Sequence, residues 1–239
     1  MRYLKTTLAL LAALCASSGH AAGPTGLLND TGQTQCDNGS NVMAACTVGT
    51  TGDAATYKRQ DGRFGRDPAA PAKVGGGVGG FDFTKVCFNG DLQGAGTCTG
   101  ALVANTTASA TGAPTTDWAC TKDNVTNLIW SLQIQTATWD TAAVNTYPDA
   151  GHNSVTRCGF ATGWRLPTRR ELLSIVLRDS RIPAIDANYF PSTQGNYYWT
   201  SDTFAPNPSG AWIVDFFDGS TLADFKTASD DVRLVRSGQ

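Results

Sequence analysis

The run from Gly159 to Leu172 constrains the fold of this 239-residue chain more than any other segment. It joins a glycine-rich turn to a tryptophan and a helix start within fourteen residues. Thr168 and Glu171 have the spacing of a capping box, in which each side chain accepts a hydrogen bond from the backbone N–H of the other residue. Pro167 favours extended backbone just before them. The apolar residues that follow predict a helix of about three turns that ends near Arg178.

Glu171 is the only glutamate among the twenty acidic residues of the chain. General acid–base catalysis needs a titratable group that is positioned by partners, and no carboxylate or histidine lies near Glu171 in the sequence. A role in the capping box accounts for the presence of Glu171. Beyond residue 22 the chain has one histidine, His152, in a segment rich in glycine and asparagine. The Gly-x-Ser-x-Gly motif of serine hydrolases is absent. The sequence therefore predicts a protein that is not an enzyme and that uses no cofactor.

Short aromatic and β-branched motifs follow one another between Trp118 and Arg236. They are Val125–Trp130, Thr138–Trp139, Gly163–Thr168 with Glu171–Leu172, Phe190–Pro191, Tyr198–Ser201, Ala211–Phe216 and Val232–Arg236. In order and spacing this half of the chain resembles the Lcl C-terminal domain family, named for the end of a bacterial collagen-like adhesin. The resemblance implies a C-type-lectin-like fold, a secreted or surface location and, for that adhesin, binding to sulfated polysaccharides. Because one fold can serve many functions, the resemblance predicts the fold of this chain more directly than it predicts the ligand.

The N-terminus has the pattern of a signal peptide. Arg2 and Lys5 precede an apolar stretch and a run of small residues. The apolar stretch is too short for a stable membrane-spanning helix. We therefore expect residues 1–22 to be a signal peptide, and the mature protein to be secreted, periplasmic or at the cell surface without a membrane span.

Removal of that segment leaves six cysteines, an even number that predicts three disulfides in an exported chain. Their spacings include no Cys-x-x-Cys, so zinc binding and thioredoxin-like chemistry are not expected. Six cysteines can pair in many ways, and the sequence alone does not select one. We predict that near neighbours pair, since this closes short loops: Cys36–Cys46, Cys87–Cys98 and Cys120–Cys158.

Composition divides the remaining chain into residues 23–116 and 117–239. The first region is rich in glycine and threonine, and it is predicted to be a disulfide-stapled extension with one strand near Phe81–Phe88. The second is predicted to be α+β: a C-type-lectin-like domain with two helices and a small twisted antiparallel sheet. Its expected elements are strands at Leu128–Leu132, Tyr197–Thr200, Ala211–Phe217 and Val232–Arg236, a helix from Thr138 to about Tyr147, the Thr168 helix, and a hairpin turn at Asp218–Gly219.

Five tryptophans of the second region could stack on sugar rings or pack in the core. Each has apolar neighbours in sequence, which favours the core. They are Trp130, Trp139, Trp164, Trp199 and Trp212. Aspartates are numerous, but they lack EF-hand spacing, so the sequence predicts no metal site.

Charge is distributed unevenly along the chain. The formal net charge of −2 becomes −4 without Arg2 and Lys5, whereas residues 157–181 hold six arginines against two acids. Arginine binds sulfate and carboxylate groups through paired hydrogen bonds. We therefore predict that three of these arginines bind an anionic ligand: Arg169, Arg170 and Arg178. The alternative is that they form a solvated surface and pair with nearby aspartates.

Together these features predict a secreted or cell-surface binding module, adhesin-like, that recognises an anionic polysaccharide. The alternative is a structural subunit of a cell-envelope or surface assembly with no small ligand. The mildly acidic chain does not favour nucleic acid as a partner.

Overall fold

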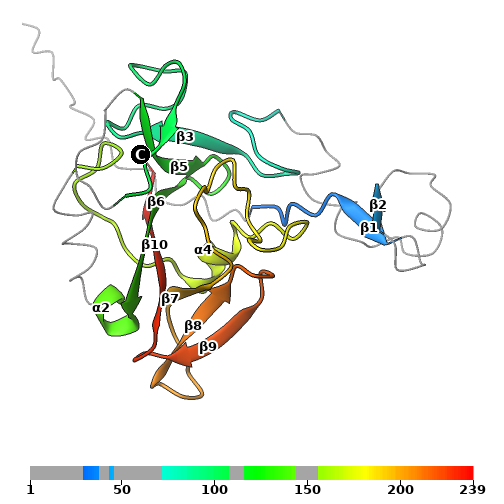
Figure 1. Cartoon of the computed structure of the whole chain (residues 1–239), viewed down its shortest axis with the longest axis vertical. Coiled ribbons are helices and arrows are strands. Elements are labelled where there is room, and N and C mark those ends of the chain that lie inside the picture. The colour runs from blue at the N-terminus through cyan, green and yellow to red at the C-terminus, as the bar shows by residue number, and fades with distance from the viewer. Residues whose placement is uncertain (1–28, 38–42, 46–71, 108–115, 144–155, 239) are drawn as a thin grey trace, which may run out of the picture.

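The computed structural model describes residues 29–37, 43–45, 72–107, 116–143 and 156–238. The predicted signal peptide lies outside the described residues. A mixed eight-stranded sheet forms the body of the molecule (Figure 1). Its strands are β3 (Phe83–Cys87), β4 (Val103–Ala104), β5 (Asp117–Asp123), β6 (Leu128–Thr138), β7 (Tyr197–Thr203), β8 (Gly210–Asp215), β9 (Thr221–Phe225) and β10 (Ser229–Ser237).

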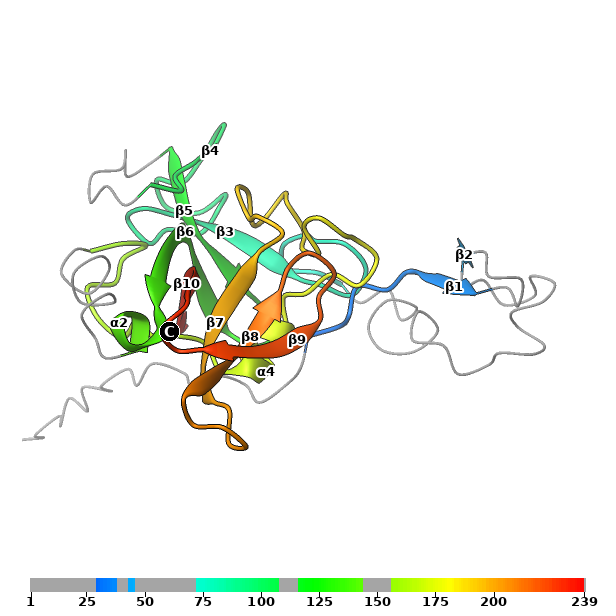
Figure 2. The ribbon, with the colours of Figure 1, turned by 60° about the horizontal axis from the view of Figure 1, so that its bottom comes forward.

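The strands lie in the order β3-β5-β6-β10-β7-β8-β9, and β4 pairs with β5. The β10–β7 and β4–β5 pairs are parallel, and the other neighbouring strands are antiparallel. A separate antiparallel pair, β1 (Gln35–Asp37) and β2 (Met43–Ala45), extends away from this body in both ribbon views (Figures 1 and 2). The main sheet includes β3 and β4, which precede residue 117 and thus come from the region predicted to be a disulfide-stapled extension.

The predicted α+β fold class is wrong, because the domain is mainly β. The described residues contain two short helices, α2 (Trp139–Ala143) and α4 (Arg169–Leu173). The sheet is large and mixed rather than small and antiparallel. None of the helices in the described ranges is long and apolar enough to cross a membrane.

The helix after Thr168 is shorter than predicted because the next backbone groups have other partners. The Ser174 hydroxyl donates a hydrogen bond of 2.6 Å to the Glu171 carbonyl, which competes with continued helix. The Leu177 amide donates to the Ala184 carbonyl at 3.0 Å. The apolar residues that suggested two further turns are therefore buried in irregular backbone.

Both faces of the sheet are covered, because successive strand residues belong to two different core clusters. Tyr198 lies in one cluster and Trp199 in the other, and Val214 and Ile213 divide in the same way. The first cluster includes α4 and the segment after it, and the second includes the Trp164–Leu166 segment and α2. Burial on both faces explains the consecutive apolar residues in the middle of these strands, such as Tyr198–Trp199 and Ile213–Val214.

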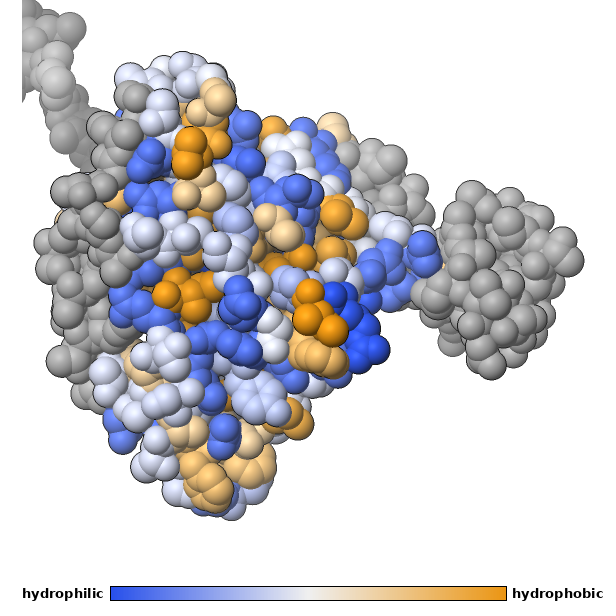
Figure 3. All heavy atoms as spheres, in the orientation of Figure 1, coloured by the Kyte–Doolittle hydropathy of each residue, from blue (hydrophilic) through white to orange (hydrophobic). Residues whose placement is uncertain are grey.

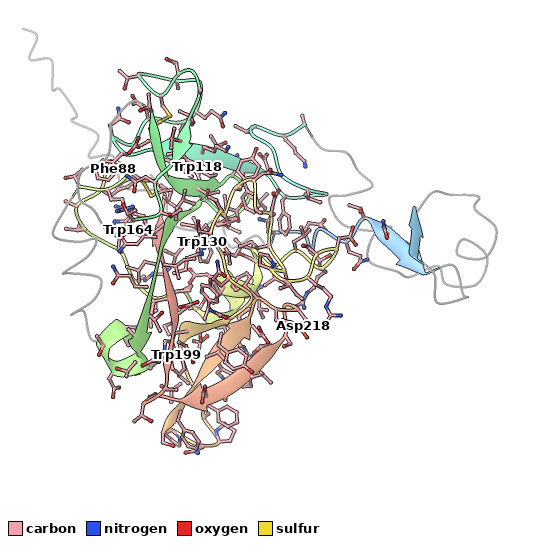
Figure 4. All side chains as sticks on the ribbon, in the orientation of Figure 1. Phe88, Trp118, Trp130, Trp164, Trp199 and Asp218 are labelled. Carbon is pink, nitrogen blue, oxygen red and sulfur yellow. A yellow bond between two sulfur atoms is a disulfide. The ribbon has the colours of Figure 1, made fainter. Side chains whose placement is uncertain are left out.

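Core packing is confirmed for three of the five tryptophans. Trp130, Trp164 and Trp199 are at most 3% exposed, and they lie among the strands of the body (Figure 4). Trp139 and Trp212 are half-buried, so part of each ring remains accessible.

Two predicted disulfides are confirmed. Cys87–Cys98 links the end of β3 to the loop that follows, and Cys120–Cys158 links β5 to the segment before the Gly159 run. Cys36 is disulfide-bonded. Its predicted partner, Cys46, lies outside the described residues.

Candidate anion-binding groove

The predicted capping box is confirmed at the start of α4. The Glu171 amide donates to Thr168 Oγ1 at 3.2 Å, and the Thr168 amide donates to Glu171 Oε2 at 2.8 Å. This arrangement fixes the first turn of α4, from which Arg169 and Arg170 project. The capping box therefore positions two of the three arginines predicted to bind a ligand.

Glu171 also forms an ion pair that the sequence reasoning missed. Arg165 donates to both carboxylate oxygens, at 2.8 and 2.6 Å. Burial opposes ionisation of Glu171, but hydrogen bonds from Arg165 and Thr168 outweigh it and lower the pKa of the carboxyl. The two residues are separated by a proline and lie outside regular helical spacing, so no periodic pattern in the sequence indicates the pair.

All three predicted arginines line one groove. Arg169 and Arg170 come from α4, and Arg178 comes from the segment that follows. The groove has a volume of ≈ 420 Å³, and the N-terminal segment Asn29–Thr31 forms part of its wall. Backbone contact fixes that wall, since the Arg178 amide donates to the Thr31 carbonyl at 2.9 Å.

Two of these arginines are held by neighbouring groups. The Arg169 guanidinium lies 4.0 Å from the centre of the Trp212 ring, a cation–π contact. Arg178 donates through Nη1 to the Gly219 carbonyl at 2.7 Å. Arg170 is exposed. The groove thus presents one stacked, one anchored and one exposed guanidinium.

The aspartates near the groove bond to backbone groups rather than to these arginines. Asp202 accepts the Arg169 amide at 2.6 Å, and Asp179 accepts the Thr34 amide at 2.9 Å. Asp30, which lines the groove, accepts the amide of Thr31 at 2.8 Å. Between described residues, Arg165–Glu171 is the only ion pair. Among the described residues, no carboxylate lies within ion-pair distance of the groove arginines, although Asp218 attracts Arg178 from further away.

The half-buried tryptophans each have a cation over the ring. Arg169 covers Trp212, and Lys226 Nζ lies 3.9 Å from the centre of the Trp139 ring. The Trp139 indole N–H donates to the Thr200 carbonyl at 2.8 Å. These contacts make both tryptophans supports for cationic side chains rather than open platforms for a sugar.

The fold and the groove define a disulfide-bonded, mainly β domain with an arginine-lined surface site. Residues 119–236 match the model of the Lcl C-terminal domain, and this part of the chain belongs to that family. The family indicates a surface-associated, adhesin-like module. A search of curated proteins found no match to the sequence. The C-type-lectin-like fold expected from the resemblance is not confirmed.

Proposed function

We propose that the protein is a non-enzymatic surface or secreted binding module whose arginine-lined groove holds an anionic polysaccharide. The observation that carries the proposal is the convergence of Arg169, Arg170 and Arg178 on one groove. A volume of ≈ 420 Å³ lies within the usual range of ligand pockets, ~300–1,000 Å³. Sulfate and carboxylate groups along a polysaccharide would meet guanidinium groups with free N–H donors.

Preorganisation supports the same proposal. Stacking on Trp212 restrains the Arg169 guanidinium, and the carbonyl of Gly219 restrains that of Arg178. A side chain that is already ordered loses less conformational entropy when a ligand binds. Because the groove is open to solvent, salt should screen its attraction for an anion strongly.

Affinity chromatography on immobilised heparin, a sulfated polysaccharide, tests the proposal. The full chain should be retained at low ionic strength and eluted by salt, with no retention on an uncharged dextran matrix. A variant in which Arg169, Arg170 and Arg178 are all replaced by serine should remain folded and pass through the heparin matrix unretained.

A matched pair separates the groove from general surface charge. Arg170→Ser and Arg181→Ser each remove one exposed arginine, but Arg181 does not line the groove. Arg170→Ser should elute at lower salt than the wild type, and Arg181→Ser close to it. Equal elution of the two variants, or no retention of the wild type, would contradict the proposal.

The alternative, a structural subunit, has one observation in its favour. Strand β9 lies at the edge of the sheet, and its residues Leu222 and Phe225 are 44% and 61% exposed. The unpaired backbone groups of an edge strand can bond to a strand of another chain, and exposed apolar side chains favour that association. If heparin binding is absent, light scattering of the wild type and of Phe225→Glu tests this function, since only the wild type should associate.

A further inference from the structure

A second cavity adjoins the β8–β9 turn at Phe217, and the Gly219 carbonyl of the same turn accepts a hydrogen bond from Arg178 of the arginine-lined groove. It has a volume of ≈ 550 Å³ and is formed where the loop before β7, the end of β8 and the start of β10 meet. Asp218 marks the tip of the turn (Figure 4), and hydrophobic and strongly hydrophilic residues adjoin on that side of the body (Figure 3). Three carboxylates line the cavity, Asp215, Asp230 and Asp231, and its lining includes no lysine, arginine or histidine.

The cavity offers hydrogen-bond acceptors in excess of donors. The Thr136 hydroxyl and the Asn196 amide donate to Asp231 at 2.9 and 3.0 Å. Asp215 accepts one backbone hydrogen bond through Oδ1. Asp230 is partly exposed, and its Oδ2 atom is buried without a hydrogen-bond partner among the described residues. Apart from the hydroxyls of Tyr197 and Ser229, the side-chain donors of the lining are directed at Asp231, so a molecule that enters meets more acceptors than donors.

Two exposed aromatic side chains also line this cavity. Tyr197 and Phe217 are each 40% exposed, whereas their chain neighbours Tyr198 and Phe216 are fully buried. The Arg181 guanidinium lies 5.4 Å from the centre of the Phe217 ring. That ring therefore already attracts one cation, as an aromatic face with its negative quadrupole does.

These properties exclude several classes of ligand. An anion would be repelled by three carboxylates, and an apolar molecule would remove them from water without compensation. Among the described residues, no three acidic, histidine or cysteine side chains converge closely enough to hold a metal ion. The carboxylates instead surround a space that fits a larger group.

We propose that this cavity binds an organic cation, a guanidinium or primary ammonium group, whose N–H donors meet Asp215 and Asp230 and whose charge lies against Tyr197 and Phe217. The cation belongs either to a basic peptide segment or to a free polyamine. The site is distinct from the arginine-lined groove and has the opposite charge. The proposal therefore does not depend on polysaccharide binding.

The electrostatic environment of Asp230 favours a cation in this cavity. Burial, and repulsion by Asp224 of β9 and by Asp231 of the same strand, raise the pKa of Asp230 to about 6. Asp215 of β8 lines the same cavity, while the buried Arg233 guanidinium interacts with Asp231. A bound cation would relieve the repulsion among the carboxylates. Its affinity should fall as the pH drops through about 6, where Asp230 becomes neutral.

Isothermal titration calorimetry of the full chain at low ionic strength and pH 7.5 tests the proposal. The probes are acetyl-Gly-Arg-Gly-amide and putrescine, with acetyl-Gly-Glu-Gly-amide as the anionic control. The wild type should bind at least one cationic probe saturably and should ignore the anionic peptide. Preference for the arginine peptide would indicate a basic protein segment, and preference for putrescine a polyamine.

Matched variants identify the site. Asp230→Asn should weaken binding at least fivefold, and so should Tyr197→Ser, while Tyr197→Phe should retain affinity. Asp140→Asn removes an equal charge from an exposed position on α2 and should change nothing. In Asp230→Asn the melting temperature should not fall and heparin retention should be preserved, which separates lost binding from misfolding. If the wild type binds neither cation, or if Asp140→Asn weakens binding as much as Asp230→Asn, the proposal is wrong.

Discussion

Arg165 and Glu171 are joined by two hydrogen bonds, and the same carboxylate caps the helix that carries the groove arginines. Arg165 is in turn fixed to β10, because its backbone exchanges two hydrogen bonds with Val235, at 3.0 and 2.9 Å. One glutamate thus connects the centre of the sheet to the first turn of α4. The geometry of the groove depends on this connection.

Replacement of Glu171 by glutamine should destabilise the protein. The change removes the ion pair and weakens the cap, and we expect the free energy of unfolding to fall by about 2 kcal/mol. Urea denaturation at pH 7 measures the change, with Asp140→Asn as the charge-matched control. Because the pKa of Glu171 is lowered in the folded state, its stabilisation is present above the unfolded pKa of ~4.3 and is lost at lower pH. The wild type and Glu171→Gln should therefore converge in stability under acid, and a constant difference would contradict this account.

The Thr168 hydroxyl should contribute to stability without contact to a ligand. Thr168→Ala should lower the free energy of unfolding by about 0.5–2 kcal/mol, whereas Thr168→Ser keeps the oxygen that accepts the Glu171 amide. Denaturant titration of both variants gives the difference. If Thr168→Ala were as stable as Thr168→Ser, the hydroxyl would have no capping role.

The two confirmed disulfides should contribute unequally. Cys120–Cys158 closes a loop with a sequence separation of 38, and Cys87–Cys98 one of 11. In the chain-entropy description the longer loop stabilises more, by about 1 kcal/mol. Serine replacement of each pair, followed by thermal melting, compares them. A larger loss from the Cys87–Cys98 variant would show that native packing, rather than loop entropy, dominates.

The acidic cavity should lower stability when it is empty. The pKa of Asp230 is raised to about 6, so the folded state binds more protons than the unfolded state between about 3.8 and 6, and stability falls as pH rises through that window. Because Asp230 is partly solvated, we expect Asp230→Asn to stabilise the protein at pH 7.5 by only about 1 kcal/mol. Melting curves from pH 4 to pH 7.5 measure this. A destabilised variant at neutral pH would mean that the carboxylate has a partner essential for folding.

Trp212 should influence polysaccharide binding indirectly. Trp212→Ala removes the ring beneath the Arg169 guanidinium, and its elution from heparin should require less salt. Trp212→Phe keeps an aromatic face and should elute between the alanine variant and the wild type. Unchanged elution of Trp212→Ala would show that Arg169 does not need this support.

Local patterns in the sequence predicted what local interactions determine. The capping box depends on residues three apart, and the two confirmed disulfides join near neighbours among the cysteines. The Asp218–Gly219 turn also lies where it was expected, between β8 and β9. In each case the interacting groups are close in sequence, so spacing alone indicates the contact.

Long-range contacts determined what the sequence could not predict. The end of α4 depends on backbone partners such as Ala184 and Thr31, which no helical periodicity indicates. Strand β9 was missed because it is an edge strand that pairs with β8 along one side, and its apolar residues Leu222 and Phe225 are exposed, so its sequence lacks the pattern of a half-buried strand. In the arginine-lined groove, Asn29–Thr31 lie beside Arg178, although most of the chain separates them in sequence. The second cavity, lined by acidic residues, likewise brings together Asp215 of β8 and Asp230 of β10. The sequence showed these aspartates only as surface or turn residues.

The position of β10 has a consequence for how the chain reaches its folded state. This last described strand lies between β6 and β7, in the middle of the sheet, and pairs with β6 from Ser229 to Ser237. Until it has been synthesised and inserted, the β5–β6 and β7–β9 portions have no strand between them, and each exposes an unpaired edge. A ribosome-bound chain that stops before Ser229 should consequently be sensitive to proteases and prone to association. Its productive folding should follow synthesis of β10.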